Sequence, residues 1–160
     1  MTSPRLIIRP ADLSEAQDAN NLLHLIDAYA RDPIGNDGPL APETYQRLIP
    51  ALRSHPATQA HLALLDEKPV GYAITLLSFS TFKAANVLNL HDIAVLPEHR
   101  GQGIGNALLD YLDQHARQLG CCKMTLEVRV DNPAQKLYQR VGFGSGEALE
   151  HFLTRWCLPD

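Results

Sequence analysis

The sequence reads His99-Arg100-Gly101-Gln102-Gly103-Ile104-Gly105 between a strand-like segment and an amphipathic helix. The preceding residues 87–95 are rich in apolar and β-branched side chains, and the following residues repeat apolar side chains at helical spacing. Closely spaced glycines let a backbone approach a ligand, and the first N–H groups of a helix attract an anion. The stretch therefore predicts a phosphate or pyrophosphate site, to which Arg100 adds a cation.

Size and composition limit the classes to which the chain can belong. With 160 residues, of which 45% are hydrophobic and 20% charged, we expect one globular domain over residues 1–160. A net charge of −4 without a basic cluster argues against a nucleic-acid partner. No apolar run approaches the ~18 residues that a membrane span needs, and the first residues show no signal-peptide pattern. We expect no membrane partner and a cytoplasmic location.

The cysteines and histidines predict neither disulfides nor a metal. Three cysteines are present, and the adjacent pair Cys121-Cys122 suits neither a disulfide framework nor a zinc knuckle. The seven histidines lack ligand spacing, so we expect no bound metal. The adjacent cysteines also fall between an expected helix and an expected strand, away from the glycine stretch, which argues against a cysteine nucleophile.

Hydrophobic periodicity predicts a mixed α/β fold in the order β-α-α-β-β-β-α-β-α-β. A hairpin comes before the glycine stretch, and a βαβ unit contains it. The expected strands cover 6–9, 61–65, 70–79, 87–95, 123–130 and part of 149–157, and the expected helices cover about 12–30, 42–53, 104–119 and 132–141.

Two blocks of this sequence resemble the GCN5-related N-acetyltransferase (GNAT) superfamily. The family signature Arg/Gln-x-x-Gly-x-Gly/Ala, between a strand and a helix, matches Arg100-Gly101-Gln102-Gly103-Ile104-Gly105. Two blocks in the correct order on a matching βαβ unit are more specific than a glycine turn alone. The resemblance is strongest from Asn86 to Phe143, and the strand before the turn is similar to that of diamine and thialysine acetyltransferases. The second block comprises Leu126-Glu127-Val128, Asn132 and Leu137-Tyr138-Gln139-Arg140-Val141-Gly142-Phe143.

The resemblance implies an N-acetyltransferase that uses acetyl-coenzyme A (acetyl-CoA) as donor and a primary amine as acceptor. We expect a polyamine-like or amino-acid amine, with a protein lysine or N-terminus as the alternative. The family also implies a homodimer. The implied cofactor-binding residues are Ile93, Ala94 and Val95, whose backbone would pair with the pantetheine arm; Arg100, Gly101, Gln102, Gly103, Ile104 and Gly105, whose N–H groups would hold the pyrophosphate; and Asn132.

Tyr138 matches the family tyrosine that protonates the departing thiolate. A phenol with a pKa near ~10 is protonated at neutral pH and can donate to a thiolate whose conjugate acid has a pKa near ~8.5. Asn132 departs from the family pattern, because it lies six residues before Tyr138 where the family asparagine lies seven before, the position of Asp131. Asn132 can therefore be a helix cap instead.

The candidate general bases are Asp92, Glu127 and His91. Similarity to the diamine acetyltransferases favours Asp92, and Glu127 is second because the next strand would carry it. Simple alternation along a strand predicts opposite faces for His91 and Asp92. Each of these side chains can instead be a solvated or hydrogen-bonded charge. Residues 78–82, rich in hydroxyls and aromatics, can line an acceptor pocket or simply form a turn.

A glycine stretch after a strand also occurs in other classes of protein. A dinucleotide-binding fingerprint needs a third glycine three positions after Gly103, where Asn106 stands. A non-catalytic acyl-CoA sensor would keep the fold without the chemistry, and the presence of Tyr138 argues against it.

Overall fold

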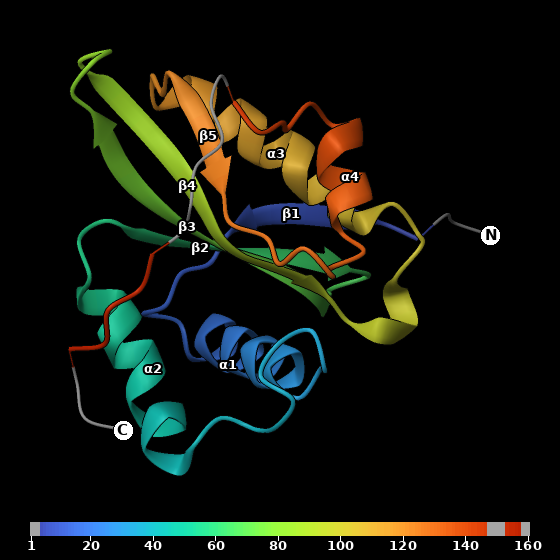
Figure 1. The fold of residues 1–160 in the computed structure, drawn as a ribbon. Coiled ribbons are helices and arrows are strands. Elements are labelled where there is room, and N and C mark those ends of the chain that lie inside the picture. Colours follow the sequence, from blue (N-terminus) through green and yellow to red (C-terminus); the bar gives the residue numbers. More distant parts are fainter. Residues whose placement is uncertain (1–3, 147–152, 158–160) are drawn as a thin grey trace. The chain divides into compact units, whose positions relative to one another are not determined.

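A computed structural model describes residues 4–146 and 153–157 of the chain. The chain falls into two compact units, Met1–Arg129 and Val130–Asp160. The first unit contains one mixed β-sheet with helices on both faces (Figure 1). The mixed α/β class predicted from the sequence is therefore confirmed, whereas the single domain over residues 1–160 stays a prediction.

The sheet has five strands in the order β1-β2-β3-β4-β5. Neighbouring strands pair antiparallel, except that β4 and β5 are parallel. The parallel pair is the two strands that flank the glycine stretch, as a βαβ unit requires. The strands are β1 (Leu6–Pro10), β2 (Thr58–Leu65), β3 (Lys68–Ser80), β4 (Ala85–Val95) and β5 (Lys123–Leu126).

Helices cover both faces of this sheet. On one face lie α1 (Ala16–Ala30) and α2 (Pro42–Ser54), and on the other lies α3 (Ile104–Gln118) (Figure 1). A short 3₁₀ helix, η1 (Pro97–His99), connects β4 to the glycine turn. The apolar core on the α1 face includes Leu22 and Leu25 of α1 against the β2 and β3 side chains. Among residues 4–146 and 153–157, no helix combines the length and apolar composition that a bilayer span demands.

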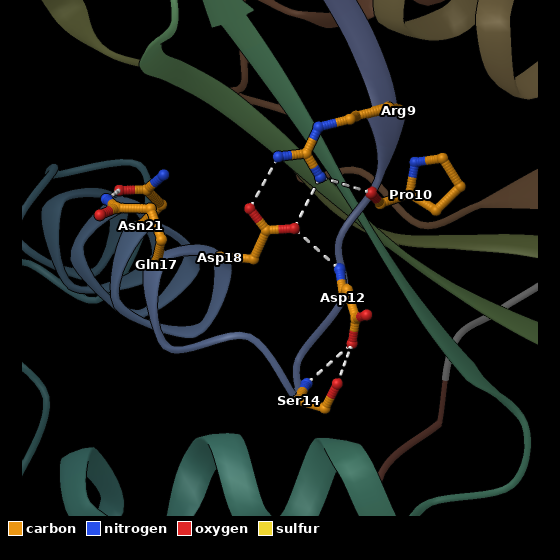
Figure 2. Close-up of polar contacts among 7 residues, drawn as sticks. All are labelled: Arg9, Pro10, Asp12, Ser14, Gln17, Asp18 and Asn21. Atoms are coloured by element: carbon orange, nitrogen blue, oxygen red, sulfur yellow. Dashed lines mark hydrogen bonds and ion pairs between the residues drawn. The ribbon is translucent and has the colours of Figure 1, made fainter.

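The α1 helix begins at Ala16, later than the predicted start near Asp12. The Asp12 carboxylate accepts hydrogen bonds from the backbone N–H and the hydroxyl of Ser14, which stabilises a turn in place of the first helical residues. Asp18, in the first turn of α1, accepts the Asp12 N–H at 2.9 Å and a two-pronged contact from the Arg9 guanidinium at 2.6 and 2.7 Å (Figure 2). These contacts join β1 to the start of α1.

The last elements are shorter than the sequence predicts. Strand β5 ends at Leu126 and not near Val130, because its pairing with β4 stops at Leu90–Leu126. In the second unit, α4 covers only Gln135–Arg140. The predicted final strand falls partly outside the described residues, and the part that is described, 153–157, has no regular secondary structure.

Candidate functional site

The glycine turn leaves its backbone open to a ligand. Gly101 and Gly103 have φ angles of 73° and 80°, which L side chains rarely adopt, and a Cβ built on either would meet no atom within 4 Å. The first hydrogen bond of this end of α3 runs from the Ala107 N–H to the Gly103 carbonyl, and no side chain caps the helix. The N–H groups of residues 104–106 therefore lie at the positive end of α3 without an intrahelical acceptor, which suits a pyrophosphate.

Strand β4 separates from β5 just before this turn. Leu90 is the last β4 residue that pairs with β5, so the β4 edge from His91 to Val95 has no partner in the β4–β5 ladder. The register with β3 also shifts here, because Leu90 pairs with Thr75 while Asp92 pairs with the adjacent Ile74. His91 is thus an extra residue, a β-bulge, which bends the strand and leaves an edge on which an extended amide arm can add.

The bulge changes which face Asp92 occupies. Ile74, opposite Asp92, belongs to the core on the α1 face, so Asp92 lies on that face as well. The predicted alternation between His91 and Asp92 does not apply across the bulge, because the extra residue interrupts it. His91 itself is exposed, whereas Asp92 is half-buried.

Asp92 lies among tyrosines. Tyr72 of β3 pairs with Ala94, one same-face position along from Asp92, and Tyr29 of α1 packs against the same cluster. Burial raises the pKa of the Asp92 carboxyl, partly opposed by the neighbouring His91. Burial and the nearby Asp92 charge raise the pKa of both tyrosine hydroxyls. The Asp92 carboxyl, poised closer to neutral pH than an ordinary aspartate, can accept a proton from a bound amine.

Arg100 does not stand free beside the glycine turn. Its Nη2 lies 2.6 Å from the Asp32 carboxylate, and its Nε donates to the Val95 carbonyl at 3.0 Å. Asp32 begins the loop after α1, which folds back so closely that a Cβ on Gly35 would lie 2.0 Å from the Tyr29 carbonyl oxygen. The Arg100 guanidinium, expected as a cation for the phosphate site, is therefore present but forms an ion pair with this loop.

Glu127 differs from its predicted setting. It follows the end of β5 and is exposed, so the expectation that it projects from a strand is wrong. The Asn89 amide donates to its two carboxylate oxygens at 3.3 and 3.2 Å. Glu127 is therefore a solvated and hydrogen-bonded carboxylate, one of the two settings considered for it.

The remaining block-two residues lie in the second unit. Tyr138 of α4 is buried, and its ring makes an edge contact with Phe143 at 6.1 Å between centroids. The Asn132 side-chain oxygen accepts the Ala134 N–H at 2.9 Å, just before α4 begins. That contact favours the alternative that Asn132 is a local cap of the helix start. The roles of Tyr138 and Asn132 toward a cofactor stay predictions.

Sequence reasoning missed Tyr29, Tyr72 and Asp32. Their individual positions carry no motif, although the loop that begins at Asp32 is conspicuous for its breakers. Residues 78–82 end β3 and enter the turn before β4, where the Ser80 hydroxyl accepts the Lys83 N–H at 3.3 Å. The Phe82 side chain is fully exposed, so this run fits turn chemistry better than a pocket lining.

Comparison with known proteins identifies the family. The model of the acetyltransferase (GNAT) family matches residues 22–143, most of the chain. The chain belongs to the GNAT family. Solved structures support the same fold, including a ribosomal-protein-alanine N-acetyltransferase from Brucella melitensis, with a TM-score of 0.76 at 24% identity over 95% of this chain and 100% of that one. An aminoglycoside acetyltransferase from a soil metagenomic sample, in complex with sisomicin, gives 0.76 at 19% identity over 94% and 96% of the two chains.

Curated GNAT relatives match a shorter part. Thialysine N-epsilon-acetyltransferase of Bos taurus is 40% identical over 74 residues, which are 46% of this chain and 43% of that protein. An N-alpha-acetyltransferase of Sulfurisphaera tokodaii is 34% identical over 99 residues, 57% of this chain and 59% of that protein. The match spans less than two thirds of either relative, so it does not by itself assign an activity or a substrate to this GNAT protein.

Proposed function

We propose that this protein is an acetyl-CoA-dependent N-acetyltransferase that acts on a primary amine of a small molecule. The observation that carries the proposal is the free β4 edge from His91 to Val95, which leads from Asp92 to the glycine turn. Such an edge can pair with the amides of an extended pantetheine arm, while the turn and the start of α3 take the pyrophosphate. Acetyl-CoA would supply the acetyl group at the β4 edge.

In this proposal, different residues bind acetyl-CoA and transfer protons. The backbone of Ile93, Ala94 and Val95 orients the arm, and the N–H groups of Gly101 to Gly105 hold the pyrophosphate. The Arg100 N–H, predicted to join them, already donates to the Pro97 carbonyl at 3.2 Å. Asp92 takes a proton from the acceptor amine, directly or through water, because an alkylammonium with a pKa near ~10.4 cannot attack a carbonyl. Tyr138 gives its hydroxyl proton to the leaving thiolate. Glu127 is the second candidate for the base.

A small acceptor is favoured by Asp92, a half-buried carboxylate that can also pair with the cationic form of an amine. Similarity to a thialysine N-epsilon-acetyltransferase points in the same direction. The second candidate acceptor is a protein N-terminus or lysine, which the similarity to an N-alpha-acetyltransferase favours. We also propose a homodimer in a cytoplasmic location; Leu153 and Trp156 are exposed apolar residues of the tail that suit an interface.

The test begins with calorimetric titration of the protein with acetyl-CoA. Thiol-release assays follow with spermidine, diamines, thialysine, amino acids and a peptide with free N-terminal and lysine amines. Binding with turnover of a small amine supports the proposal, and turnover of the peptide alone supports the protein acceptor. Binding without any turnover supports an acyl-CoA sensor, and no binding contradicts the proposal.

A further inference from the structure

The Tyr72 hydroxyl is a buried polar group. Tyr72 is 1% exposed, and its oxygen has no hydrogen-bond partner among residues 4–146 and 153–157. A buried hydroxyl without a hydrogen bond costs free energy, and most buried polar groups in proteins find a partner. Packing explains the ring of Tyr72, which a phenylalanine would supply equally well, but it does not explain the hydroxyl.

The carboxylate of the neighbouring Asp92 also lacks a hydrogen bond within the described part of the chain. Among the described residues, no hydrogen bond or ion pair reaches the Asp92 side chain. Tyr72 and Asp92 occupy diagonal positions on adjacent strands and on one face of the sheet, because Tyr72 pairs with Ala94 and Asp92 with Ile74. Diagonal neighbours in an antiparallel pair are about 7–8 Å apart at Cα. At that separation one small group can contact both the tyrosine hydroxyl and the carboxylate.

We propose that Tyr72 is a positioning residue for the acceptor: its hydroxyl and the Asp92 carboxylate together hold one small hydrogen-bonding group. That group is the acceptor nitrogen itself or the water that carries its proton to Asp92. The proton leaves the nitrogen for the carboxylate, and the hydroxyl of Tyr72 keeps its own proton. This inference rests on the proposed N-acetyltransferase function and adds a specific requirement to it.

Tyr72→Phe tests the proposal, because it removes the hydroxyl and keeps the ring in the core. We expect kcat/KM for the amine to fall about 10-fold to 100-fold, the range for a hydrogen bond to a charged or reacting group. The affinity for acetyl-CoA stays unchanged. The melting temperature stays the same or rises, because the variant loses an unsatisfied buried group. If Tyr72→Phe raises KM for the amine, the group held between Tyr72 and Asp92 is the acceptor nitrogen. If it lowers kcat instead, that group is the water.

Tyr111→Phe is the matched control. Tyr111 lies on α3, against His61 on the other face of the sheet, and the same substitution there leaves kcat/KM unchanged. If Tyr72→Phe keeps kcat/KM within about twofold while Asp92→Asn abolishes it, this inference is wrong and the proposed function stands. If the wild-type protein turns over no amine, the proposed function fails and the inference with it.

The pH dependence of kcat/KM is a second measurement, which remains informative if Tyr72→Phe is less stable than expected. The groups facing Asp92 are Tyr72 from β3, Tyr29 from α1 and His91 from its own strand. The charges of Asp32, Arg129 and Arg100 act on Tyr29 in turn. A hydroxyl that stabilises the carboxylate lowers its pKa, so its loss shifts the acidic limb of kcat/KM to higher pH. An unshifted limb in the folded variant overturns the proposal.

Discussion

The guanidinium of Arg100 lies 2.6 Å from the carboxylate of Asp32 and ties the glycine turn to the loop after α1. Asp32 is largely buried and also accepts the Ile34 N–H at 2.9 Å, so one carboxylate organises the loop and anchors the arginine. Both contacts lower the pKa of Asp32, which keeps it charged at neutral pH. The glycine turn and the loop beside Tyr29 are therefore connected by this ion pair in the first unit.

Reversing the charge at this connection tests the glycine turn as the pyrophosphate site. Arg100→Glu places a carboxylate beside Asp32 and beside the turn, so we expect the affinity for acetyl-CoA to fall about 10-fold or more. Calorimetric titration measures it. Arg117→Glu is the control, because Arg117 makes an exposed ion pair at the other end of the same helix. Equal affinities for the wild type and Arg100→Glu would remove the turn from the cofactor site.

The proposed role of Tyr138 as a general acid is tested by removing its hydroxyl alone. If Tyr138 protonates the leaving thiolate, Tyr138→Phe lowers kcat about 100-fold or more, the usual range for a general acid, and leaves the affinity for acetyl-CoA near wild type. Steady-state thiol release and calorimetry provide the two measurements. Tyr45→Phe, at an exposed position of α2, controls for loss of a phenol. Unchanged turnover in Tyr138→Phe would exclude Tyr138 from the mechanism.

The pH dependence of kcat/KM distinguishes the candidate bases. Asp92 must be ionised to accept a proton, so activity rises with pH through its pKa, which burial raises above the ordinary value for aspartate. We expect this acidic limb in the wild type and its disappearance, with most of the activity, in Asp92→Asn. Glu127→Gln is the matched variant at an exposed carboxylate. Loss of the limb in Glu127→Gln instead would make Glu127 the base.

The sequence predicts those features that depend on local chemistry. Periodicity and glycine spacing are properties of neighbouring residues, so the β4–turn–α3 unit around Gly103 could be predicted. The bulge at His91 depends on how β4 pairs with β3 and where β5 ends, which no local pattern encodes. The bulge places Asp92 on the same face of the sheet as Ile74 and Tyr72. Simple alternation from His91 to Asp92 therefore does not hold, and no sequence pattern indicates the placement of Tyr72 beside Asp92.

The Arg9–Asp18 ion pair predicts a stability effect. Asp18→Ala removes the carboxylate that accepts from the Arg9 guanidinium and the Asp12 N–H, and we expect a loss of about 2 kcal/mol in the free energy of unfolding at pH 7. This is below the loss for a fully buried pair, because Arg9 is 40% exposed. Urea denaturation measures it, with Asp113→Ala, from an exposed helix pair, as the control.

The same pair has a defined pH dependence. The Arg9 guanidinium lowers the pKa of Asp18, so its stabilisation is present above the unfolded-state pKa near ~3.9 and disappears as the pH falls through the lower folded-state value. The difference in stability between wild type and Asp18→Ala therefore narrows below about pH 4. A difference that is constant from pH 7 to pH 2 would show that the ion pair does not stabilise the fold.

His61 makes the stability of the fold depend on pH at higher pH values than Asp18 does. His61 of β2 is 1% exposed and packs against Tyr111 of α3. Its Nε2 lies 3.2 Å from the Thr75 hydroxyl, and its Nδ1 has no hydrogen-bond partner in the described part of the chain. Burial lowers its pKa to about 4, against about 6.5 in the unfolded chain. Between these values only the unfolded chain binds the proton, so stability falls as the pH drops from about 6.5 to about 4, by up to about 3 kcal/mol.

Urea unfolding at pH 7, 6 and 5 measures this slope. We expect a flatter slope in His61→Gln, whatever its absolute stability, because the substituted side chain does not titrate. Some slope remains, since burial lowers the pKa of the neighbouring His115 in the same direction. His24→Gln, the same substitution at an exposed position of α1, is the control for the effect of replacing a histidine. An equal slope in His61→Gln and wild type would mean that His61 takes up its proton without unfolding the chain.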